Sequence, residues 1–94
     1  MNRNDIHGLS ELFKSLSDPT RVRILHALTE QDEWSVGELA EQLDISQSAL
    51  SHQLRVLRAH QIVTYRRDGK QSFYRIKQRR IIGIMAAGLN VVQA

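Results

Sequence analysis

Hydrophobic positions recur along the chain with a helical period as far as His60, and the period changes to that of strands beyond it. The first predicted helix runs from Asp5 to Leu16, and residues 1–4 are expected to be loose. A second helix is predicted to begin at Pro19, behind Asp18 as its N-cap, and to end near Thr29. The apolar side of the first helix consists of Ile6, Leu9, Leu12, Phe13 and Leu16.

Two further helices are predicted in close succession. Ser35 caps a helix over residues 36–43, and Glu38 at its third position completes a capping box. After a short turn at Asp44-Ile45, the next helix spans Ser46 to His60. Two helices joined by so tight a connection make a helix-turn-helix. The inward stripe of the second of them consists of Leu50, Leu54 and Leu57.

The outward face of the 46–60 helix carries no acidic residue. A solvated helix face normally carries Glu and Lys, whereas these serine, glutamine, histidine and arginine side chains suit hydrogen bonds to phosphates and base edges in a major groove. An ordinary amphipathic helix is the alternative interpretation of this segment taken alone. The candidate DNA contacts are Ser46, Gln47, Ser48, Ser51, His52 and Arg55.

Two β-favouring runs follow, over residues 62–67 and 71–76. Asp68-Gly69 between them indicates a type I′ hairpin turn. A basic hairpin directly after a helix-turn-helix is the usual layout of a winged helix, whose wing tip touches the DNA backbone or the minor groove. A surface hairpin with incidental charge is the alternative. The candidate contacts in this wing are Arg66, Arg67, Lys70 and Gln71.

A final helix is predicted from Gln78 to Val92, and its stripe is more apolar than a terminal helix of a small domain leaves in water. Gly83 and Gly88 would let another helix approach closely. We therefore interpret the first and last helices as a homodimer interface, with packing on the helix's own domain as the alternative. The predicted interface residues are Leu9, Leu12, Ile81, Met85, Leu89 and Val92.

The predicted architecture is mainly α with a β-hairpin wing, in the order α-α-α-α-β-β-α, as one winged helix-turn-helix domain over residues 1–94. No cysteine is present, which excludes disulfides and thiolate metal or redox chemistry. No secretory signal and no run of membrane-spanning length is found, so a cytoplasmic protein without a membrane partner is expected.

The net charge of +3 hides a marked asymmetry between the two halves of the chain. Residues 1–45 hold four Lys/Arg against nine Asp/Glu, whereas residues 46–94 hold nine Lys/Arg against Asp68 alone. The second half is therefore strongly basic, and it contains both the helix-turn-helix face and the wing. A polyanionic partner, double-stranded DNA, is the natural inference.

The chain contains, in this order, the strings LFKSLSDPTRVRILHAL, SVGELAEQL, ISQSALSHQLRVLRAHQIV and RRDGKQSFYRI. These four strings resemble the ArsR/SmtB family of bacterial winged-helix repressors, and the resemblance covers roughly residues 9–92. It implies a homodimer that binds a pseudo-palindromic operator and represses transcription until a signal releases it. Gln47, Ser48, Ser51 and His52 match the groove-facing positions of the family, and Arg67 and Lys70 match its basic wing tip, whereas Arg55 is added from helical spacing.

The sensor half departs from the family pattern, so no metal site and no cofactor is predicted. Ser35 stands where many members place a ligand cysteine, and a serine hydroxyl is a poor ligand for soft ions. Other members of the family bind zinc or cobalt between the two last helices, through an Asp-x-His pair and a downstream pair from the partner chain. In this sequence the first pair falls on Gln78 and Arg80, and the downstream positions fall near Asn90 and Gln93. One alternative is a non-thiol site that joins His7 of one chain to Asp32 or Glu33 of another.

The sequence therefore predicts a DNA-binding transcriptional regulator and not an enzyme. It contains no nucleophile elbow or phosphate loop, and the adjacent Ser51 and His52 diverge on their helix. A winged helix used for protein–protein contact is the alternative function. The effector stays open between a small organic ligand, a non-thiol metal and no ligand, and Arg79 and Arg80 could bind an anionic one.

Overall fold

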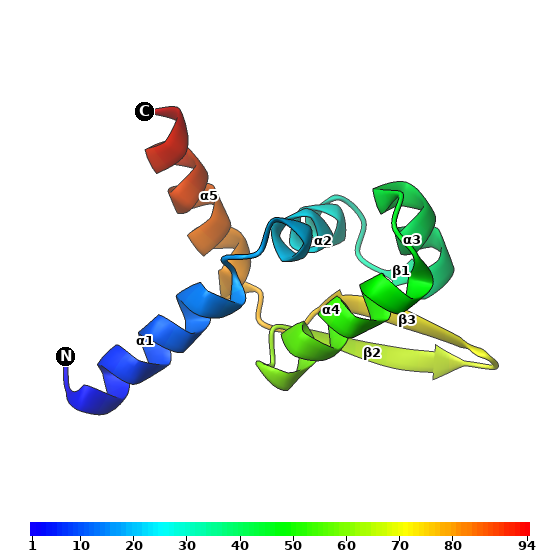
Figure 1. Ribbon diagram of the computed structural model, residues 1–94, viewed down its shortest axis with the longest axis horizontal. Coiled ribbons are helices and arrows are strands. Elements are labelled where there is room, and N and C mark those ends of the chain that lie inside the picture. Colours follow the sequence, from blue (N-terminus) through cyan, green and yellow to red (C-terminus); the bar gives the residue numbers. More distant parts are fainter.

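Five helices and three short strands make up the fold in a computed structural model that describes residues 1–94 (Figure 1). Their order confirms the predicted winged helix-turn-helix. The helices are α1 (Arg3–Ser15), α2 (Pro19–Glu30), α3 (Val36–Leu43), α4 (Gln47–Ala59) and α5 (Arg80–Gln93). The strands are β1 (Trp34–Ser35), β2 (Val63–Asp68) and β3 (Gln71–Ile76).

Local capping explains where several helices begin. Asp18 accepts a hydrogen bond from the backbone of Arg21, and Ser35 and Glu38 form the predicted capping box of α3. The expectation that residues 1–4 are loose is wrong. The side chain of Asn2 accepts from the amide of Asp5 at 2.8 Å, and the Asp5 carboxylate accepts from the amide of Asn2 at 3.2 Å. This second capping box satisfies free amides and starts α1 two residues early.

The core lies between α2, α3, α4 and the base of the sheet. The predicted inward stripe of α4 is confirmed, because all three of its leucines are completely buried. Ile81, the first apolar residue of α5, is also buried, with 1% of its surface exposed. Ile81 therefore belongs to the core and leaves no surface for a partner, which corrects its assignment to the dimer interface. The buried apolar residues from the sheet region are Ile62, Val63, Tyr74 and Ile76.

The wing is a three-stranded antiparallel sheet in the order β1-β3-β2, and not the two-stranded hairpin predicted. β1 adds only the pairs Trp34↔Tyr74 and Ser35↔Phe73. The predicted turn is also displaced. Asp68 pairs with Gln71, so the loop is Gly69-Lys70, with φ 63° at Gly69 and no positive φ at Lys70. That pattern is typical of a type II′ turn with glycine first and not of the Asp-Gly type I′ turn.

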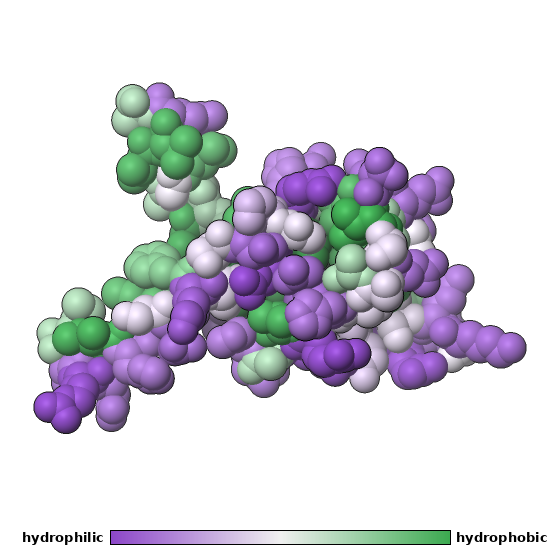
Figure 2. All heavy atoms as spheres, in the orientation of Figure 1, coloured by the Kyte–Doolittle hydropathy of each residue, from purple (hydrophilic) through white to green (hydrophobic).

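The two terminal helices extend from one end of the molecule, away from the wing (Figure 1). In α1 only Ser15 is buried, and in α5 only Ile81. Figure 2 shows that hydrophobic atoms gather on both of these helices, whereas the wing and the adjoining surface are largely hydrophilic. None of the helices has the length and apolar character required to cross a membrane.

Candidate nucleic-acid interface

The turn between α3 and α4 is held by backbone hydrogen bonds that set the direction of α4. Asp44 ends α3 in the left-handed conformation with φ 54°. The amide of Ile45 donates to the carbonyl of Ala40 at 3.1 Å, and that of Asp44 donates to Glu41 at 3.2 Å. This is a Schellman arrangement, which satisfies the last carbonyls of α3. Arg23 of α2 adds a hydrogen bond of 2.6 Å to the carbonyl of Leu43.

The outward face of α4 carries the predicted contact residues in accessible positions. Gln47, Ser48, His52 and Arg55 are exposed, and Ser51 is half-buried. Ser46 is exposed, but its Oγ is already used, because it accepts from the amide of Ala49 at 3.1 Å and lies 3.3 Å from Ser48 Oγ. The side chains of Gln47, Ser51, His52 and Arg55 make no hydrogen bond within the protomer.

The N-terminus of α4 favours an anion. Its first turn contains no acidic residue. The free amides and the helix dipole therefore present a positive potential that no side chain of this turn neutralises. The polar face of α4 thus combines open hydrogen-bonding groups with a field that suits phosphate.

The register of the wing places its cations on two different faces. Directly paired residues of an antiparallel sheet share a face, and neighbours along a strand alternate. Tyr65 and Tyr74 pair on the face that looks toward α4, since Arg58 of α4 lies 4.9 Å from the ring centre of Tyr65. Arg67, two residues after Tyr65, shares that face. Arg66 pairs with Phe73 on the opposite face.

Arg66 is engaged within the protein, unlike the other predicted wing contacts. Its Nε donates to Glu33 Oε2 at 2.9 Å, and its Nη2 donates to Glu33 Oε1 at 2.8 Å. The guanidinium also lies 4.6 Å from the ring centre of Phe73, and Asp68 is 3.9 Å away. The hydrogen bond from Arg66 lowers the pKa of the Glu33 carboxyl below its usual value. Arg67, Lys70 and Gln71 are exposed and have no such partner.

The contacts that join the wing to the helices were not predicted from the sequence. Arg58 lies over Tyr65, whose ring stacks on that of Tyr74 with centres 5.2 Å apart. Glu33 binds Arg66 across 33 positions of the chain. No local spacing signals these contacts, because they depend on the register between β2 and β3 and on a strand of only two residues.

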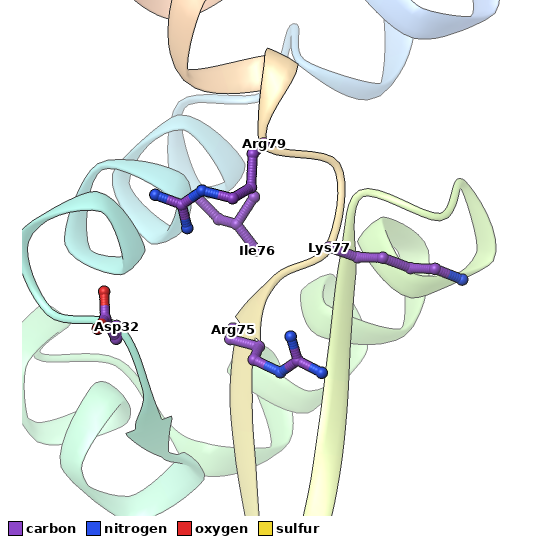
Figure 3. Close-up of a pocket in the computed structure, with 5 residues that line it drawn as sticks. All are labelled: Asp32, Arg75, Ile76, Lys77 and Arg79. Atoms are coloured by element: carbon purple, nitrogen blue, oxygen red, sulfur yellow. The ribbon is translucent and has the colours of Figure 1, made fainter.

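A basic hollow of about 430 Å³ lies at the base of the wing, beside the start of α5 (Figure 3). Arg79 reaches across it on the side of Asp32, whereas Arg75 and Lys77 point the other way. Lys77 Nζ donates to Gln61 Oε1 at 2.6 Å. The cations therefore do not converge on one point. The lining residues are Asp32, Arg75, Ile76, Lys77 and Arg79.

Histidines and carboxylates do not gather into a group of three that could hold a metal ion within the protomer. His26 has only Glu30 beside it, 3.0 Å away and largely exposed. Glu33, one of the carboxylates considered for a site shared with His7 of another chain, is occupied by Arg66. That interaction weakens the case for a metal at this position, because the cation would have to displace a guanidinium from both carboxylate oxygens.

Known proteins resemble this chain in both sequence and fold. A family profile described as a helix-turn-helix domain matches residues 16–66, more than half of the chain. The transcriptional repressor SmtB homolog of Synechocystis is 37% identical over 84 residues, which are 89% of this chain and 63% of that protein. The chain therefore spans slightly less than two thirds of that relative's length.

Two solved structures extend the comparison. The crystal structure of Mycobacterium tuberculosis Rv0081 is 40% identical, with a TM-score of 0.82 over 89% of this chain and 84% of that one. The solution structure of Mb0332 from Mycobacterium bovis is 24% identical, with a TM-score of 0.84 over 99% and 87%. That protein is described as a homodimeric winged helix-turn-helix DNA-binding domain and a possible ArsR-family regulator, and its likeness bears on the fold alone.

Proposed function

This chain belongs to the ArsR/SmtB family of winged helix-turn-helix transcriptional regulators, which are not enzymes, and we propose that it is a dimeric repressor of a palindromic operator. The observation that carries this proposal is the face of α4. Its accessible serine, glutamine, histidine and arginine side chains are mostly without partners in the protomer, and none of them is acidic. Binding to chromosomal DNA also places the protein in the cytoplasm.

The contacts divide into two classes by their chemistry. Gln47, Ser48, Ser51 and His52 read base edges in the major groove, and Arg55 and the N-terminus of α4 meet the flanking phosphates. Ser46 contributes mainly by capping that helix. Arg67, Lys70 and Gln71 at the wing tip bind the backbone or the minor groove, since Arg67 projects on the same face of the sheet as the residues next to α4.

A second copy of this chain is the partner that the terminal helices fit. A groove of about 770 Å³ runs between α1, α2 and α5 and is lined mainly by apolar side chains. Phe13 and Leu89 within it are 55% and 53% exposed, and Val92 is 81% exposed. A dimer that reads two half-sites one turn of DNA apart must hold its two α4 helices about 34 Å apart. Leu9, Leu12, Met85, Leu89 and Val92 remain the proposed interface residues.

The proposal is tested by selecting bound duplexes from a random DNA pool and measuring affinity at several salt concentrations. Arg67→Ala and Lys70→Ala should weaken binding to all sequences alike. Each should reduce the slope of log K against log salt by about two units, because the dimer loses one phosphate contact from each of its two wings. Gln47→Ala and Ser48→Ala should instead change which bases are preferred.

Lys14→Ala is the matched control, because it removes the same charge from an exposed position on α1. It should leave the salt slope unchanged. If none of the α4 and wing variants alters affinity, slope or preference, the groove assignment is wrong. If the wild-type protein selects no duplex but binds another protein, the protein–protein alternative is favoured.

A further inference from the structure

Side-chain contacts join the wing to the helix-turn-helix and its flanking segment on both faces of the sheet. On the α4 side, Arg58 lies over Tyr65, which stacks on Tyr74. On the opposite side, Arg66 of β2 binds Glu33, which directly precedes β1 and α3. These two contacts join the same hairpin to the segment that precedes α3 and to the last turn of α4.

We propose that the second contact, which we call the Glu33–Arg66 latch, sets the angle between the wing and the helix-turn-helix for DNA binding. In this view Arg66 is a positioning residue and not a phosphate contact. The inference rests on the proposed DNA-binding function and deepens it, because it assigns different roles to two adjacent arginines. Arg67 binds DNA, whereas Arg66 holds the strand that presents Arg67.

The latch spans the full width of the sheet. The strand order is β1-β3-β2, so the Arg66 side chain must cross the central strand to reach Glu33. It does so over Phe73 of β3, whose ring centre lies 4.6 Å from the guanidinium. β1 itself contributes only two residue pairs. This one side chain therefore links the segment before α3 directly to the far strand of the wing, past the central strand.

Bidentate geometry and lower exposure distinguish the latch from the other close ion pair of the protein. Both carboxylate oxygens are used, at 2.9 and 2.8 Å, which is the bidentate arrangement that arginine forms most strongly. The side chains of Glu33 and Arg66 are 29% and 53% exposed, against 65% and 70% for Glu30 and His26 in the other close pair. The stack on Phe73 further restricts the guanidinium.

Positioning and phosphate contact predict opposite effects when Glu33 loses its charge. If Arg66 bound a phosphate, Glu33 would compete for it, and removal of the carboxylate would strengthen DNA binding. If the latch positions the wing, the same change loosens the wing and weakens binding. The sign of the effect therefore decides between the two roles.

The experiment compares Glu33→Gln with Asp32→Asn, which removes the same charge one residue away, where no ion pair reaches the wing. Arg66→Gln is compared with Arg75→Gln, an arginine on the same face of the sheet without a hydrogen-bond partner. The probe is a duplex of about 30 base pairs, long enough for two half-sites, selected by the wild-type protein from a random pool.

We expect Glu33→Gln and Arg66→Gln each to weaken binding by roughly three- to fivefold relative to their controls, as for a well-formed exposed pair. The double variant should bind like either single variant, because the second change removes nothing more. Arg66→Gln should keep the wild-type salt slope. In the free protein, the NMR-measured pKa of the Glu33 carboxyl should rise toward its usual value in Arg66→Gln.

Tighter binding by Glu33→Gln than by Asp32→Asn would overturn the inference, as would a salt slope lowered by about two units in Arg66→Gln, one for each wing of the dimer. Either result leaves the proposed function intact, because the wild-type protein still binds the probe. Failure of the wild-type protein to select any duplex would instead overturn the proposed function, and the inference with it.

Discussion

The body of the molecule buries its hydrophobic side chains, whereas the two terminal helices leave many of theirs exposed. α2, α3, α4 and the sheet region contain every buried core residue except Ile81. α1 and α5 contain most of the exposed large ones, namely Ile6, Leu9, Phe13, Leu89, Val91 and Val92. The radius of gyration, 13.9 Å against about 12 Å for a compact chain of this length, reflects the two projecting helices. The body therefore buries its apolar side chains within the protomer, whereas the terminal helices leave an apolar surface exposed.

The largest expected effect comes from truncating one leucine in each region. Leu54→Ala in α4 removes a fully buried side chain and should lower the free energy of unfolding by about 3 kcal/mol, through lost burial and the cavity left behind. Urea denaturation followed by circular dichroism measures this. The loss should not depend on protein concentration, because the cavity lies within one protomer.

Leu89→Ala in α5 is the matched variant, since the same atoms are removed from a residue that is 53% exposed. Its effect should grow with protein concentration, because the stability contributed by association depends on how much dimer is present. A concentration-independent loss as large as that of Leu54→Ala would show that the α5 surface already belongs to the protomer's core.

A charge on the terminal helices should separate the two protomers without unfolding the body. Leu89→Glu would place an unpaired carboxylate in the apolar groove and raise the dimer dissociation constant by about 100-fold, close to 2.7 kcal/mol. Analytical ultracentrifugation measures it. Asn90→Glu, a neighbouring and exposed position outside the groove, is the control and should dimerise normally. Equal behaviour of the two variants would contradict the assignment of this surface.

The same contrast explains what could be predicted from the sequence. Features that depend on residues a few positions apart were predicted, and the structure confirms them. They are the inward leucines of α4, the caps at Asp18, Ser35 and Ser46, and the tight turn before α4. Ile81 and Leu89 follow one helical stripe, yet the first is buried and the second exposed. Periodicity identifies an apolar face, but it does not show where the core ends along that face.

Contacts between distant segments lay outside what local patterns can show. β1 has two residues, too few for an alternation to be recognised, and its pairing with β3 is what brings Glu33 near Arg66. The candidate face of α4 could be predicted because helical spacing alone defines it. The different roles that we assign to Arg66 and Arg67 could not be predicted in this way. They follow from the register of the sheet and from a partner of Arg66 that lies 33 positions away in the chain.

The smallest expected effect is the loss of stability when either of the two capping boxes, one in each region, is removed. Ser35 is buried and starts α3 inside the body, whereas Asn2 is exposed and starts α1 at the free end of a projecting helix. Ser35→Ala should lower the free energy of unfolding by about 1 kcal/mol, since α3 unfolds only with the body. Asn2→Ala should cost less than about 0.5 kcal/mol, because a helix end that frays on its own contributes little to global unfolding. Urea titrations of both variants at one protein concentration provide the measurement, and equal losses would mean that α1 folds as part of the body from its first turn.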